Sequence, residues 1–164
     1  MPKAYFHLYK ALEEQITYYY LERQQNHVFN YAERGKFPWL REDLAFLHEI
    51  PPQLSPAMNL PVINTVGQLV GALYVIEGST LGGQLISRSL NQHLGLTLNT
   101  GARFFYGYGE QTALMWQSFI DFADCISGDE TQCQAAEQSA WQTFQVFNQV
   151  LDDYVQQELT SDWA

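Results

Sequence analysis

Residues 68–90 read QLVGALYVIEGSTLGGQLISRSL. This stretch contains no proline and is apolar through most of its middle. On a helical wheel of about 100° per residue, one narrow stripe contains Gly71, Gly78, Gly82 and Ser89. The opposite side is apolar, and a third side carries polar side chains, namely Glu77, Gln84 and Arg88. The stretch therefore predicts a long helix with one bare face.

The glycines of this helix are energetically costly. Each glycine inside a helix costs about 1 kcal/mol relative to alanine, so Gly71, Gly78, Gly82 and Gly83 together cost on the order of 4 kcal/mol. Two arrangements would compensate: a neighbouring helix packed against the backbone, or a flat ligand lying on it. Spacing alone leaves both open, although helix packing is the more common reason for such a stripe. Glycines also allow a helix to bend.

The segments before this helix are also predicted to be helical. Apolar residues from Tyr5 to Tyr19 recur at three- and four-residue steps, and a polar helical stretch is expected from Leu21 to Gly35. Pro38 is expected in the first turn of a short helix. The prolines at 51, 52 and 56 predict a connecting loop.

The segments after it complete an all-α chain. The long helix is expected to end at Gly95, before an aromatic-glycine turn at 104–109. An apolar stripe from Met115 to Ile126 predicts another helix, and Asp129 is a candidate N-cap for the last one. That helix is expected to pack through a seam of Ala136, Ala140, Phe144, Phe147, Leu151 and Tyr154. We expect one helical domain over residues 1–164.

Composition limits the possible partners. Eighteen acidic and eight basic residues give a formal net charge of −10, which disfavours nucleic acids and anionic membranes. No apolar run approaches the roughly 20 residues of a membrane helix, and the first residues lack a signal-peptide pattern. The two cysteines, Cys125 and Cys133, have no metal-type spacing. We therefore expect a cytoplasmic protein with reduced thiols.

The central string carries a family resemblance. Residues 74–88, YVIEGSTLGGQLISR, resemble the distal helix of the heme oxygenase family, in particular the bacterial branch often found beside phytochromes. The resemblance continues at residues 8–13, 36–40 with 43–44, 94–96, 101 with 104–109, and 112 with 115–119, so that it covers nearly the whole chain.

The resemblance implies a helical bundle in which a kinked, glycine-rich helix lies over one face of heme. It assigns Gly78, Ser79, Gly82 and Gly83 to the distal heme face. The implied reaction converts heme to biliverdin, iron and carbon monoxide, with oxygen and electrons from an external donor. The implied ligand is heme or a bilin-like flat molecule.

The sequence also departs from the family pattern. Family members bind iron through a histidine on a first helix, which by this resemblance would lie before Met1. His7 is then the remaining candidate iron ligand, while His27, His48 and His93 are expected at the surface or near helix ends. Many family members also have an aspartate where this chain has Ser79.

Two functions therefore remain open. One is an active heme oxygenase whose iron ligand is His7 or an imidazole from a partner. The alternative is a catalytically inactive homologue that binds heme, a bilin or another protein. Without the family's first helix, an apolar groove would be exposed near Tyr5, Phe6, Tyr9 and Tyr18 to Tyr20, and we expect a homodimer or another partner to cover it.

Overall fold

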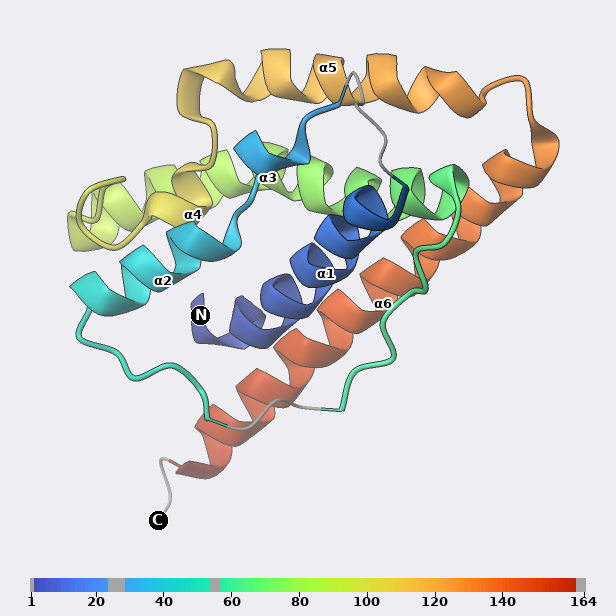
Figure 1. The fold of residues 1–164 in the computed structure, drawn as a ribbon. Coiled ribbons are helices and arrows are strands. Elements are labelled where there is room, and N and C mark those ends of the chain that lie inside the picture. The colour runs from blue at the N-terminus through green and yellow to red at the C-terminus, as the bar shows by residue number, and fades with distance from the viewer. Residues whose placement is uncertain (1, 24–28, 54–56, 162–164) are drawn as a thin grey trace.

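The computed structural model describes residues 2–23, 29–53 and 57–161, which form helices and no strands (Figure 1). The expected all-α class is confirmed. The helices are α1 (Pro2–Arg23), α2 (Phe37–Phe46), α3 (Val66–Leu94), α4 (Arg103–Tyr106), α5 (Thr112–Ala123) and α6 (Glu130–Ser161). Short 3-10 turns lie at η1 (Tyr31–Glu33), η2 (Gly109–Gln111) and η3 (Asp124–Ile126).

The central helix α3 has well-defined ends. The Thr65 side chain accepts a hydrogen bond from the Gln68 backbone, and the Gln68 side chain accepts one from the Thr65 backbone, which is a complete capping box. At the other end Gly95 adopts a left-handed conformation with φ 67°. The helix is continuous between these caps. The expected kink at its glycines therefore does not interrupt the helix.

The other helices pack around α3 (Figure 1). α3 and α6 lie together near their N-terminal ends and diverge toward their C-terminal ends. α1 packs against α6, and Leu8, Leu12 and Ile16 of its inner face are fully buried. α5 contacts α3 from the other side. This divergence leaves the second half of α3 without cover from α6.

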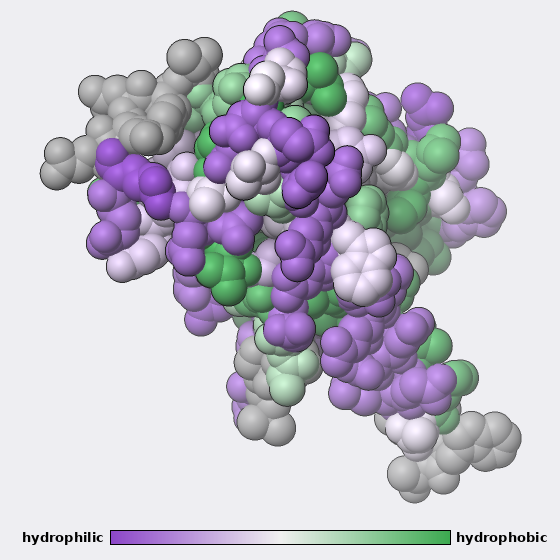
Figure 2. All heavy atoms as spheres, turned by 90° about the vertical axis from the view of Figure 1, so that its right-hand side faces the viewer, coloured by the Kyte–Doolittle hydropathy of each residue, from purple (hydrophilic) through white to green (hydrophobic). Residues whose placement is uncertain are grey.

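Two surface properties bear on possible partners. Among the described residues, α3 is the one helix long and apolar enough to cross a membrane, but more than half of its most apolar window is buried within the fold, as in a core helix. On the face turned to the viewer in Figure 2, hydrophilic side chains predominate and apolar ones form small separate areas.

The prediction of a helix from Leu21 to Gly35 is wrong for residues 29–35. There the chain forms only η1, whose first turn is capped by the Asn30 side chain; residues 24–28 lie outside the described part. The irregular backbone allows both Arg34 and Lys36 to turn inward toward Glu77 of α3. A regular helix at the surface would expose at least one of these side chains.

The seam expected along α6 is rotated. The buried line consists of Ser139, Thr143, Val146 and Val150, whereas Phe144 is 47% exposed. Small polar side chains face α3 because the two backbones approach closely, and the Ser139 hydroxyl donates to the Gln68 carbonyl at 2.7 Å. Ala136, Phe147 and Tyr154 of the expected seam do pack against the core beside this line, so the periodicity of α6 predicted its buried face in part.

The N-terminal aromatic residues are also less exposed than expected. Tyr9 and Tyr19 belong to the core, and Tyr5 and Phe6 are half-buried. Tyr9 packs edge-on against both Phe104 and Phe147. Of the residues expected to line an exposed groove, Tyr18 is clearly exposed, at 63%.

Candidate functional site

The first half of the glycine stripe is closed by α6. A Cβ atom at Gly67 would overlap the carbonyl oxygen of Gln132, and one at Gly71 would overlap that of Ala136. No side chain fits in either position. These two glycines are therefore explained by the close approach of two helix backbones.

The second half of the stripe is open. A Cβ atom at Gly82 would meet nothing within 4 Å, and one at Gly78 would make only ordinary contact with the Trp116 ring, at 3.6 Å. Exposed apolar side chains flank these glycines, and Leu85 among them is 69% exposed. We call this surface the open strip; it consists of Gly78, Leu81, Gly82, Leu85 and Ile86.

Ser79 lies beside the open strip in a neutral hydrogen-bond pair with Tyr9. The Ser79 hydroxyl donates to the Ile76 carbonyl at 2.7 Å and accepts from the Tyr9 phenol at 3.0 Å. Burial raises the pKa of Tyr9, so the phenol stays protonated and remains a donor. A serine hydroxyl has two acceptor lone pairs, which leaves one for a water molecule.

Gly83, the fourth glycine predicted for the heme face, lies elsewhere. It is buried, and a Cβ atom there would stand 2.9 Å from the Phe105 carbonyl oxygen of α4. Packing against α4 accounts for its missing side chain, so Gly83 is not part of the open strip.

The structure does not bring His7 to the open strip. Its Nε2 atom donates to the Pro52 carbonyl at 2.8 Å. His7 precedes Tyr9 by two residues, which places the two side chains about 200° apart around α1. Because Tyr9 faces α3, His7 faces away from it.

The other described histidines lie at helix ends, as expected. His48 follows α2 with a φ of 54° and is exposed. His93 lies in the last turn of α3, with Nδ1 2.9 Å from the Ser89 carbonyl oxygen. His27 is outside the described residues. Within the described ranges, no group of three or more His, Cys, Asp or Glu side chains is arranged to bind a metal ion.

A buried ionic cluster behind the strip was not predicted from the sequence. Glu77 is 1% exposed and accepts hydrogen bonds from Arg34 at 2.8 Å, from Lys36 at 2.7 Å and from the Tyr108 phenol at 3.0 Å. Burial lowers the pKa of Lys36, while the nearby Glu77 carboxylate acts in the opposite direction. A glutamate within the apolar run YVIEGS was the available signal, because a buried carboxylate requires partners.

The fold and this geometry define a class of protein: a helical domain around a long, glycine-rich central helix that is bare and open over half of one face. The family model described as heme oxygenase matches residues 1–153 of 164, so the chain belongs to the heme oxygenase family. No curated protein matches the sequence.

Membership in this family implies heme, and the open strip fits one part of that molecule. Bare backbone at Gly78 and Gly82 allows a planar ring to approach the helix, and the apolar side chains beside them suit its edges. The strip fits the flat macrocycle, but none of the described histidines is directed at it to bind iron.

Proposed function

We propose that the protein binds heme with one face of the macrocycle on the open strip and cleaves it oxidatively to biliverdin, iron and carbon monoxide. The observation that carries this proposal is the open space at Gly82. The glycine costs about 1 kcal/mol of helix stability relative to alanine, and none of the described residues occupies the space it leaves.

The residues around the strip have separate roles in this proposal. Gly78 and Gly82 allow the ring to lie close to the α3 backbone. Leu81, Leu85 and Ile86 exclude water from its edges. Heme supplies the oxygen chemistry, and the electrons come from an external donor.

Ser79 would position water near the reacting face. Its remaining lone pair accepts a hydrogen bond from a water molecule, while Tyr9 and the Ile76 carbonyl fix the hydroxyl. A serine cannot carry the charge that an aspartate brings to this place, so water is held here by a neutral acceptor.

The iron ligand belongs to the proposal as well. His7 would have to leave Pro52 and turn toward α3, whereas an imidazole from a partner could approach the exposed strip directly. We propose that a second copy of the chain or another protein covers the apolar strip, and that the complex is cytoplasmic. Size-exclusion chromatography with light scattering tests whether two copies associate, and a stable monomer in the presence of heme would contradict the homodimer.

The alternative function is an inactive homologue that holds heme or a bilin without cleaving it. Two observations favour it: His7 faces away from the strip, and the group beside the strip is a neutral Tyr9–Ser79 pair.

A heme titration followed by absorbance distinguishes these functions. A sharp Soret band with a six-coordinate histidine signature, followed by formation of biliverdin with ascorbate or a reductase in air, supports the enzyme. A broad, weak band and no biliverdin support the inactive homologue. No spectral change at all would contradict heme binding. The variant His7→Ala tests whether His7 is the iron ligand. The sharp Soret band should be lost in this variant if His7 binds the iron, and should persist if the imidazole comes from a partner.

A further inference from the structure

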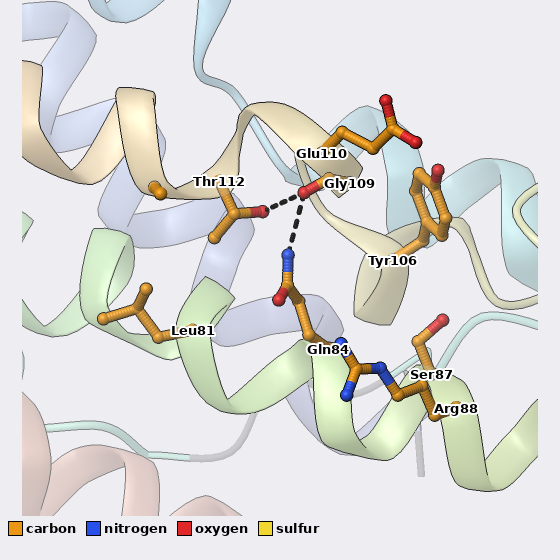
Figure 3. Close-up of a pocket in the computed structure, with 9 residues that line it drawn as sticks. Leu81, Gln84, Ser87, Arg88, Tyr106, Gly109, Glu110 and Thr112 are labelled. Atoms are coloured by element: carbon orange, nitrogen blue, oxygen red, sulfur yellow. Dashed lines mark hydrogen bonds between the residues drawn. The ribbon is translucent and has the colours of Figure 1, made fainter.

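A pocket of about 410 Å³ lies on the other side of α3 (Figure 3). One wall is α3, which contributes Leu81, Gln84 and Arg88, and the other is the segment from Tyr106 to Ala113. Gln84 follows Gly82 by two residues, so the two lie about 200° apart around the helix. The polar wall of the pocket is therefore on a different side of α3 from the open glycines, and Leu81, which belongs to the open strip, lies at the border between the two sites.

The far wall of the pocket is held rigidly. The Gly109 carbonyl accepts hydrogen bonds from the Gln84 side chain at 2.8 Å and from the Thr112 hydroxyl at 2.7 Å (Figure 3). Gly109 has a φ of 58°, and a Cβ atom there would overlap the Tyr106 ring. These constraints fix the wall before any ligand binds, which reduces the entropic cost of binding.

The pocket carries one free cation and one free anion on opposite walls. Arg88 projects from α3 and Glu110 from the facing turn (Figure 3). Neither has an ion pair or hydrogen bond to the described part of the chain.

We propose that this pocket binds a small zwitterion of dipeptide size. Its carboxylate would pair with the Arg88 guanidinium, whose planar donors match a carboxylate, and its ammonium would pair with Glu110. Leu81 and Ala113 offer apolar surface for a side chain. A simple anion would be repelled by a chain of net charge −10, whereas a zwitterion brings no net charge.

The test is an NMR titration of the ¹⁵N-labelled full chain with the dipeptide Gly-Leu. We expect saturable shifts at the Gln84 side-chain amide and the Gly109 amide, with a Kd on the order of 1 mM. N-acetyl-Gly-Leu lacks the ammonium and Gly-Leu amide lacks the carboxylate, and each should bind at least about tenfold more weakly.

Matched variants locate the site. Arg88→Gln and Glu110→Gln should each weaken Gly-Leu binding about tenfold or more, while Arg41→Gln, at another exposed arginine far along the chain in α2, should leave it unchanged. Heme binding should be the same in all three variants. No saturable binding up to tens of millimolar, equal affinity for the acetylated peptide, or unchanged affinity in Arg88→Gln would each overturn the proposal.

Discussion

The backbone of α3 at Gly71 lies directly against that of α6 at Ala136, leaving no room for even a methyl group. Gly82 lies eleven residues further along, only about 20° away around the helix, and its Cβ position is empty. One glycine stripe thus has two explanations: helix packing where α3 and α6 meet, and an open strip where they diverge.

This difference predicts opposite effects of the same substitution. Gly71→Ala should destabilise the protein by about 1–3 kcal/mol, because the new methyl group overlaps backbone atoms that cannot move independently. Gly82→Ala should stabilise it by up to about 1 kcal/mol, because alanine is the better helix former and meets no neighbour. Urea unfolding of both variants measures the two free energies. Equal effects, or destabilisation by Gly82→Ala, would show that the stripe has a single environment.

The buried cluster predicts a large effect at Glu77. Glu77→Gln leaves Arg34 and Lys36 buried without their counter-charge, which should cost about 3–5 kcal/mol of unfolding free energy. The control Glu110→Gln, at an exposed carboxylate with no ion pair in the described structure, should change it by less than about 0.5 kcal/mol. A loss below about 1 kcal/mol in Glu77→Gln would mean that the cluster contributes little to the fold.

The same variant has a predicted pH dependence. Burial lowers the pKa of Lys36 below its ordinary value of 10.5, and Glu77 opposes this, so removing Glu77 lowers the pKa further. Between that lowered pKa and 10.5, the unfolded chain binds more protons than the folded one, and stability then rises with pH. This range begins at a lower pH in the variant than in the wild type, so the deficit of Glu77→Gln should shrink as the pH is raised through it toward 10.5. Urea midpoints measured at several pH values check this, and a constant deficit would speak against a buried, charged Lys36.

The pair of Tyr9 and Ser79 is predicted to be coupled. Tyr9→Phe removes a hydrogen bond worth about 0.5–1.5 kcal/mol, whereas Ser79→Ala leaves a fully buried phenol without this partner and should cost about 1–3 kcal/mol. The double variant should cost less than the sum of the two single variants. A double-mutant cycle with zero coupling energy would mean that the 3.0 Å contact does not form in solution.

Local signals in the sequence predicted most of the helices. Gly95 and Asp129 are capping residues of the expected kind, and each marks the expected end of a helix. The segment after α1 was missed because its conformation depends on Arg34 and Lys36 reaching Glu77, more than forty residues away. Hydrophobic periodicity carries no information about such a distant polar contact.

The candidate site was predictable only in part. The sequence identified the glycines but could not tell which of them face a helix, because Gly71 and Gly82 look alike on a helical wheel. Which glycines face α6 depends on the angle at which α6 crosses α3, and that angle is a tertiary property. The pairing of Ser79 with Tyr9 is likewise a contact across seventy residues of sequence.

Heme affinity in the variant Gly82→Leu tests directly whether heme lies on the open strip. The leucine would project into the open strip and block a flat ligand, while leucine is a better helix former than glycine and should not weaken the fold. Gly128→Leu is the control, because Gly128 also has nothing within 4 Å but lies outside α3.

We predict that the wild type and Gly128→Leu give the same heme titration by absorbance, and that Gly82→Leu binds at least about tenfold more weakly, which corresponds to about 1.4 kcal/mol. Circular dichroism at matched concentrations verifies that all three are folded. A folded Gly82→Leu variant that binds heme as tightly as the wild type would contradict the claim that heme lies on the open strip.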